Sequence, residues 1–217
     1  MLPITLGDGA RSPLRVLCIG AHSDDIEIGA GGTLLRLLSE RPGSTVLWVV
    51  LSSTPERERE ARGSAGEFLK STNSSTIVVK SFRESYFPYV AAEVKDFFEE
   101  MKKMIVPDVV FCHRRDDMHQ DHRLVAELAW NTYRNHAILE YEISKYEGDL
   151  GTPNVFVPLP KSVAERKVEL LMKHFASQAG RSWFRPETFR GLMAVRAVEC
   201  NAPEGQAEAF YARKLVM

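Results

Sequence analysis

The feature that most constrains the fold is a regular alternation of short apolar runs with helical patterns between residues 14 and 132. Four runs, at residues 14–20, 45–51, 76–79 and 108–112, have the length and composition of β-strands. The run at 45–51 is almost wholly apolar, which indicates a strand buried on both faces of a sheet. Because strands that are separated by helices need crossover connections, they are expected to pair in parallel.

Each apolar run is followed by a helical pattern. Over residues 90–105 the apolar side chains recur on one face of an amphipathic helix, which Pro107 ends. Thr54 and Pro55 form an N-cap and a first-turn proline, so a helix is expected to begin there. A further helix is expected over 124–132, and Ser162 with Glu165 predicts a capping box at the start of a later one.

These elements predict an α/β fold, a Rossmann-like three-layer sandwich with a mostly parallel central sheet. The length of 217 residues fits one domain that spans residues 1–217. Residues 147–160, which are rich in glycine and proline, are expected to form a loop over the functional edge of the sheet or a contact between copies of the chain.

Composition and charge exclude several classes of partner. A net charge of −1, with no basic run interleaved with aromatic residues, argues against nucleic acid and anionic membranes as partners. The first thirteen residues contain no apolar stretch of signal-peptide length, and no apolar run is long enough to be a transmembrane segment. Cys18, Cys112 and Cys200 are expected to be buried free thiols, so we predict a cytoplasmic protein in a reducing compartment.

Two clusters of acids and histidines follow the first and the fourth predicted strands. The first reads His22-Ser23-Asp24-Asp25, and the second extends from Asp117 to His122. In open parallel sheets, ligands bind outside the carboxyl ends of the strands, where the loops converge. Neutral imidazole and carboxylate are common ligands of divalent metals, and a catalytic zinc site takes three of them and leaves a position for water. The sequence therefore predicts one metal site divided between two loops.

Taken singly, these residues have simpler explanations. An aspartate before a helix is usually an N-cap, and a lone loop histidine is usually solvated or hydrogen-bonded. The joint pattern favours a metal site, because three of the six histidines lie beside three aspartates within ten positions. His136 and His174 are expected to be structural. Residues 20–32 lack the G-x-G-x-x-G turn and carry acids where a pyrophosphate would bind, which argues against a nicotinamide enzyme.

At these residues the chain resembles the LmbE-like or PIG-L family of N-acetylglucosaminyl deacetylases. The family motif Ala-His-Pro-Asp-Asp-x-Glu followed by Gly-Gly-Thr-Leu is matched over residues 21–27 and 31–34, and His-x-Asp-His is matched over 119–122. Ser23 and Gln120 replace the usual prolines, which alters loop rigidity but removes no ligand.

The resemblance implies a role for each residue of the two motifs. It makes His22, Asp25 and His122 the ligands of one Zn²⁺ ion, although another divalent metal remains open. It makes Asp24 the general base, places His119 at the developing oxyanion or the leaving amine, and has Asp121 hold the His119 ring. Asp24 and His119 both remain candidates for protonating the amine. Asp116, Asp117 and His113 are candidates for orienting the ligands.

The implied activity is zinc-dependent removal of acetyl from an N-acetylated amino sugar or glycoconjugate, a small-molecule or conjugated substrate of open identity. Arg57, Arg59 and Trp183 are candidates for substrate binding, although Arg57 and Arg59 also fit a solvated helix face. A metal- or sugar-binding module without turnover remains an alternative. So does a non-haem iron oxygenase, because two histidines and a carboxylate also form its metal site. Whether the chain forms a homo-oligomer stays open.

Overall fold

The structure is a computed structural model, and it describes residues 5–6, 12–72 and 74–215. The described residues form seven strands, six α-helices and two short 3-10 helices. The strands are β1 (Arg15–Gly20), β2 (Thr45–Val50), β3 (Ser74–Val79), β4 (Val109–His113), β5 (Ala137–Tyr141), β6 (Val155–Pro158) and β7 (Ala207–Tyr211). The helices are α1 (Asp25–Glu40), α2 (Pro55–Phe68), η1 (Phe87–Tyr89), α3 (Ala91–Met104), α4 (Gln120–Thr132), α5 (Lys161–His174), η2 (Ala176–Gln178) and α6 (Pro186–Cys200). The sequence predicts no signal peptide in the first thirteen residues. Most of these residues lie outside the described part of the chain.

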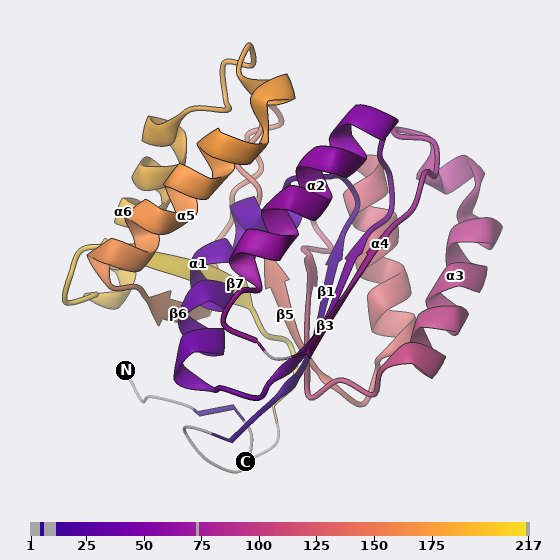
Figure 1. Cartoon of the computed structure of the whole chain (residues 1–217), viewed down its shortest axis with the longest axis horizontal. Helices are drawn as coiled ribbons and strands as arrows, with labels where there is room; N and C mark the ends of the chain where they lie inside the picture. Colours follow the sequence, from indigo (N-terminus) through magenta and orange to yellow (C-terminus); the bar gives the residue numbers. More distant parts are fainter. Residues whose placement is uncertain (1–4, 7–11, 73, 216–217) are drawn as a thin grey trace.

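The strands form one mixed sheet in the order β3-β2-β1-β4-β5-β7-β6 (Figure 1). The first five pair in parallel, whereas β7 is antiparallel to both of its neighbours. The predicted α/β fold with a mostly parallel sheet is therefore confirmed. The strand order reverses between β1 and β4, and such a switch point is where open α/β sheets bind ligands.

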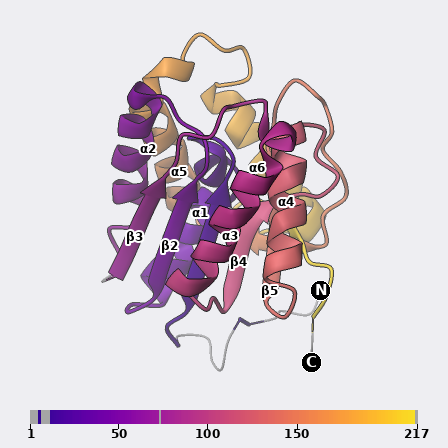
Figure 2. The same cartoon turned by 90° about the vertical axis from the view of Figure 1, so that its right-hand side faces the viewer.

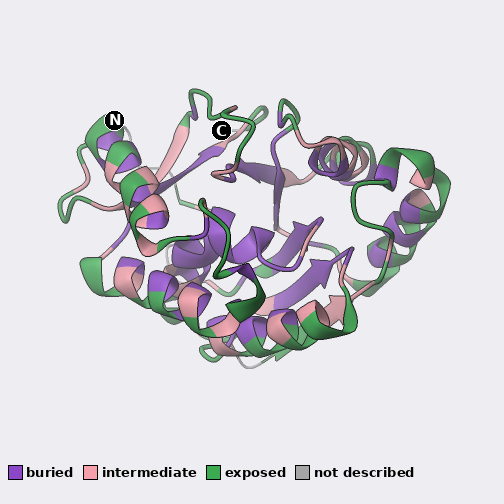
Figure 3. Cartoon of the chain, turned by 90° about the horizontal axis from the view of Figure 1, so that it is seen from above, coloured by how far each residue is buried: buried purple, intermediate pink, exposed green. Residues whose placement is uncertain are grey.

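Helices cover both faces of the sheet, which makes three layers. Helices α1, α2, α5 and α6 lie on one face and α3 and α4 on the other (Figures 1 and 2). Alternate residues of a strand point to opposite faces of the sheet, and each face has its own hydrophobic core. In β1, Val16 and Cys18 belong to the core under α1, α2, α5 and α6, whereas Leu17 and Ile19 belong to the core under α3 and α4. Seen from above in Figure 3, the central strands are mostly buried and the outward faces of the helices are exposed, whereas β3 and β6 at the two ends of the sheet are only partly buried.

Several details of the predicted elements are confirmed. The hydroxyl of Thr54 caps α2 by accepting a hydrogen bond from the Arg57 N–H, and Pro55 is the first helical residue. All three cysteines are buried and free. No helix in the described part of the chain is long and apolar enough to cross a membrane.

In the later part of the chain, the structure differs from the predicted secondary structure. The capping box at Ser162 is wrong, because α5 begins earlier, after Pro160, and its N-cap makes no side-chain hydrogen bond. Residues 147–160 are not loop throughout, since they include β6. Strands β5 and β7 and helix α6 were not predicted from the sequence.

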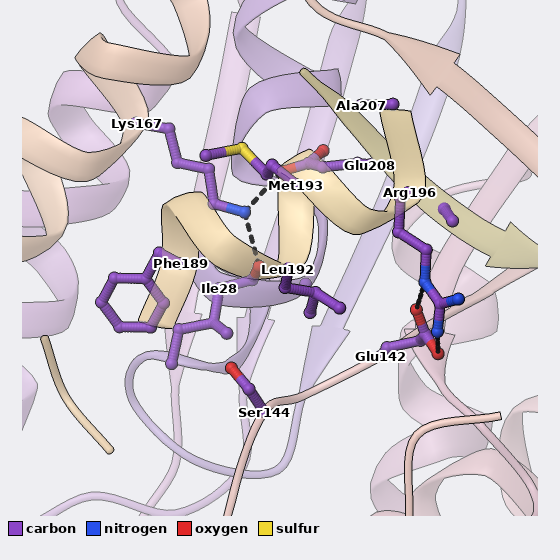
Figure 4. A pocket seen from close by; sticks show the side chains of 12 residues that line it. Ile28, Glu142, Ser144, Lys167, Phe189, Leu192, Met193, Arg196, Ala207 and Glu208 are labelled. Atoms are coloured by element: carbon purple, nitrogen blue, oxygen red, sulfur yellow. Dashed lines mark hydrogen bonds and ion pairs between the residues drawn. The ribbon is translucent and has the colours of Figure 1, made fainter. Parts of the chain in front are cut away.

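A buried ion pair contacts the middle of α1 (Figure 4). The ammonium group of Lys167 lies 2.6 Å from the Glu208 carboxylate and donates to the Ile28 carbonyl at 2.6 Å. Glu208 in turn accepts from the N–H groups of Gly32 and Thr33, at 2.8 and 2.6 Å. A Cβ at Gly32 would lie 3.1 Å from Glu208 and 2.5 Å from a Leu159 methyl, so this close approach requires glycine. The Lys167–Glu208 pair thus makes hydrogen bonds to backbone groups of α1, the helix that begins at Asp25.

Candidate metal centre

The two predicted clusters meet at the switch point of the sheet. Residues 21–24 connect β1 to α1, and residues 114–119 connect β4 to α4. Because β1 and β4 are neighbours, both connections leave the sheet at the same edge. Asp25 and His122 lie in the first turns of the two helices, and His22 lies in the first connection. The structure therefore brings together the three residues that the family resemblance implies as metal ligands.

The ring nitrogens and carboxylate oxygens of these three residues lie within a few ångströms of one another. His22 Nδ1 lies 3.1 Å from His122 Nε2 and 3.5 Å from Asp25 Oδ2. His122 Nε2 lies 3.6 Å from Asp25 Oδ1. The side chains of Asp25 and His122 are almost fully buried.

Two carboxylates fix the tautomers of the histidines. His22 Nε2 lies 3.1 Å from Asp121 Oδ2, and His122 Nδ1 lies 3.0 Å from Asp117 Oδ2. An ionised carboxylate only accepts hydrogen bonds, so both of these ring nitrogens carry a hydrogen. In the neutral rings, the opposite nitrogens then present bare lone pairs to each other and to Asp25. Such a convergence of acceptors fits a cation, and histidines that bind metals commonly have a carboxylate behind them.

The position of Asp121 corrects one prediction. Its carboxylate does not hold the His119 ring but lies against His22. The same carboxylate accepts hydrogen bonds from the N–H groups of Ser85 and Phe87, at 2.6 and 3.1 Å. The segment that contains these residues, between β3 and α3, is thereby fixed beside the site, and no motif in the sequence indicated this contact.

His119 and His113 differ from the other two rings because a backbone N–H approaches each of them. His119 is the N-cap of α4, and its Nδ1 accepts from the Asp121 N–H at 3.3 Å. A neutral His119 therefore carries its hydrogen on Nε2 and acts as a donor rather than as a ligand. His113 Nε2 lies 2.9 Å from the Ala21 N–H and 3.1 Å from Asp25 Oδ2. In the described part of the chain, two overlapping groups have ligand atoms close enough together to hold a metal ion, and His122 belongs to both: His22 with His119, and Asp25 with His113.

The charges of the site are unequally distributed. Burial would lower the pKa of His22, but hydrogen bonds to Asp121 and Asp25 raise it to about 10. Burial and the neighbouring His113 lower the pKa of His122 to about 3. Burial would raise the pKa of Asp25, but the rings of His122 and His113 hold it well below its ordinary value. Without a metal, the centre thus holds an anionic Asp25 and a cationic His22.

The adjacent aspartates Asp24 and Asp25 point to different partners. Asp25 faces the histidines, whereas Asp24 Oδ1 lies 2.9 Å from the guanidinium of Arg57. The other oxygen of Asp24 is buried and makes no hydrogen bond to the described residues. Burial raises the pKa of Asp24, and the charge of Arg57 opposes this shift. Asp24 is therefore a buried carboxyl group whose second oxygen has no partner within the described chain.

The other candidates for substrate binding lie further out. Arg59 is exposed on α2, and Trp183 packs edge-on against Phe184 with the ring centroids 5.5 Å apart. In the described part of the chain, neither side chain hydrogen-bonds or ion-pairs with the histidine cluster. Arg57 does reach the site, where it contacts Asp24.

Comparisons with known proteins concern the family and the fold of the chain. A family model described as PIG-L, GlcNAc-PI de-N-acetylase, matches residues 17–133. This range contains both clusters. A search of curated protein sequences finds no match.

Several solved structures share the fold. The conserved protein TT1542 from Thermus thermophilus is 19% identical, with a TM-score of 0.72 over 94% of this chain and 96% of that chain. The N,N'-diacetylchitobiose deacetylase from Pyrococcus horikoshii is 20% identical, with a TM-score of 0.68 over 92% and 83%. GalB, the 4-carboxy-2-hydroxymuconate hydratase from Pseudomonas putida, is 18% identical, with a TM-score of 0.66 over 94% and 98%. At these identities the similarity concerns the fold.

Proposed function

Because the chain belongs to the PIG-L family of GlcNAc-PI de-N-acetylases, we propose that it is a zinc-dependent hydrolase that removes acetyl from an N-acetylated amino sugar or glycoconjugate. The observation that carries the proposal is the convergence of His22, Asp25 and His122, each of which presents acceptor atoms to one space. We propose these three residues as the ligands of the ion. Bound zinc supplies Lewis acidity, which makes water easier to deprotonate and polarises the amide carbonyl.

Asp24 fits the role of general base. Its free oxygen can accept a proton from the attacking water, and a raised pKa makes a carboxylate a stronger base. The water oxygen bonds to the acyl carbon, the C–N bond breaks, and the departing nitrogen takes up a proton. Acetate and a free amine result.

His119 fits the role of hydrogen-bond donor to the oxyanion. Its Nε2 carries the hydrogen, because Nδ1 accepts a backbone hydrogen bond. Burial and the nearby His22 lower the pKa of His119, which favours the neutral ring. A neutral imidazole is a poor acid, so we propose that Asp24 passes the proton to the amine while His119 stabilises the developing negative charge.

The proposal is tested by measuring acetate from purified protein with and without metal. The chain is treated with a chelator, reloaded with Zn²⁺ and incubated with N-acetylated sugars that are free, nucleotide-linked, lipid-linked or thiol-conjugated. We expect loss of one acetyl group by mass spectrometry from at least one class, only in the zinc-loaded sample. Binding without acetate would instead support a non-catalytic module, and oxygen consumption with Fe²⁺ would support an oxygenase. Because GalB shares the fold, acetate itself must be quantified rather than loss of substrate.

A second prediction concerns the protons that are released when zinc binds. His22, with a pKa of about 10, is protonated at pH 7 in the metal-free chain, whereas a ligand must offer a bare nitrogen. We expect zinc binding at pH 7 to release about one proton per ion, and the apparent affinity to rise about tenfold per pH unit and to level off above the pKa of His22. Calorimetric titration in buffers of different ionisation enthalpy measures the released protons. Zinc binding without proton release would mean that His22 is already neutral in the metal-free chain.

A further inference from the structure

Lys145 lies behind the metal centre and contacts the carboxylate that supports His122. Its Nζ is 3.1 Å from Asp117 Oδ2, the same oxygen that faces His122 Nδ1. The Lys145 side chain is only 9% exposed, and that of Asp117 only 3%. Exposed ion pairs contribute little because water screens them, but screening is weak at this depth. The Lys145 charge therefore acts directly on Asp117.

The second partner of Lys145 joins two connecting segments. Nζ lies 2.6 and 2.7 Å from the two oxygens of Asp149. Asp149 Oδ2 also accepts from the Met118 N–H at 2.7 Å, and the Asp149 carbonyl accepts from Arg114 at 2.6 Å. The segment after β5 is thus tied to the connection between β4 and α4, next to the first turn that carries His122.

Asp117 has few other constraints on its orientation. Its Oδ1 accepts from the His119 N–H at 2.8 Å, which is a contact within its own connection. Of the contacts to its carboxylate, the one from Lys145 comes from a different part of the chain. If the ammonium group is removed, Asp117 and Asp149 remain as two buried carboxylates that flank the emptied position. Their repulsion would turn Asp117 away from His122.

From this geometry we infer that Lys145 is a positioning residue of the metal centre, which holds Asp117 against His122 and so fixes the ring for metal binding. The inference rests on the proposed function, because it assumes that His122 binds the metal. Residues behind metal ligands typically affect affinity by about 10- to 100-fold when they are replaced. Lys145 acts one contact further out, so we expect an effect at the lower end of that range.

The test compares Lys145→Met with Asp149→Asn. Lys145→Met removes the charge but keeps a side chain of similar length. Asp149→Asn weakens the link between the segment after β5 and the connection from β4 to α4, but it leaves the contact between Lys145 and Asp117 in place. We expect Lys145→Met to weaken Zn²⁺ binding about tenfold in competition with a chromophoric chelator, and Asp149→Asn to weaken it less. The visible absorption of the Co²⁺-loaded protein should change in Lys145→Met, because it reports ligand geometry independently of turnover. Thermal unfolding of both variants shows how much of any effect is general destabilisation.

The outcomes separate the two proposals. A folded Lys145→Met with unchanged Zn²⁺ affinity and Co²⁺ spectrum would overturn the inference, as would equal losses in both variants. If Lys145→Met does not fold, Lys145→Gln carries the test, since its amide removes the charge but keeps a hydrogen-bond donor for Asp117. Absence of Zn²⁺ binding by the unsubstituted chain would instead overturn the proposed function.

Discussion

Replacing Asp24 with asparagine is expected to lower the rate of acetate release by about 10²- to 10⁴-fold, the usual contribution of a general base. The amide has the same size but cannot take the proton of the attacking water. The free oxygen of Asp24 has no partner among the described residues and can therefore accept that proton. The measurement is kcat for acetate release by the zinc-loaded variant.

Two controls make this result specific. Zinc affinity should change little in Asp24→Asn, because Asp24 points to Arg57 and not to the histidines. Glu56→Gln is a matched replacement of an acid by its amide on the exposed first turn of α2, and kcat should remain near that of the unsubstituted protein. A variant Asp24→Asn that retained most of its rate would assign the base to another residue.

The first half of the fold could be predicted because its strands are buried on both faces. The apolar runs that became β1, β2 and β4 are nearly continuous, and each is followed by a helical pattern. Strand β5 has no such signal, because it contains Glu140, which is buried among Arg213, Trp130 and the Arg115 N–H. Strand β7 contains Glu208, whose partners come from α1 and α5. A charged residue that is neutralised by tertiary contacts looks like a surface residue in the sequence.

The site could be predicted in outline for a related reason. Residues of one motif lie in the same short chain segment, so their proximity, as for Asp24 and Asp25, follows from the sequence alone. Partners from different segments are set by the fold. The family resemblance assigned Asp121 to His119, but the structure places its carboxylate on His22, 99 positions away. Lys145 was missed because a single lysine after a strand carries no pattern.

Replacing Lys167 with methionine is expected to lower the free energy of unfolding by about 3–5 kcal/mol, because it leaves the Glu208 carboxylate buried without its counter-charge. Both side chains are only 3% exposed, so water cannot take the place of the missing group without opening the core. Urea unfolding at pH 7 measures the change. Lys70→Met is a matched control, since Lys70 pairs with Glu67 but is 68% exposed, and its loss should cost less than about 1 kcal/mol.

The double variant Lys167→Met/Glu208→Leu tests why the pair is there. A buried ion pair that only neutralises itself is often replaced by apolar residues without loss of stability. Here Lys167 also donates a hydrogen bond to the Ile28 carbonyl. Glu208 also accepts hydrogen bonds from the N–H groups of Gly32 and Thr33. Hydrogen bonds to charged groups contribute about 1.5–3 kcal/mol each. We therefore expect the double variant to remain destabilised, and a double variant as stable as the unsubstituted chain would mean that α1 pairs these groups internally once the ions are gone.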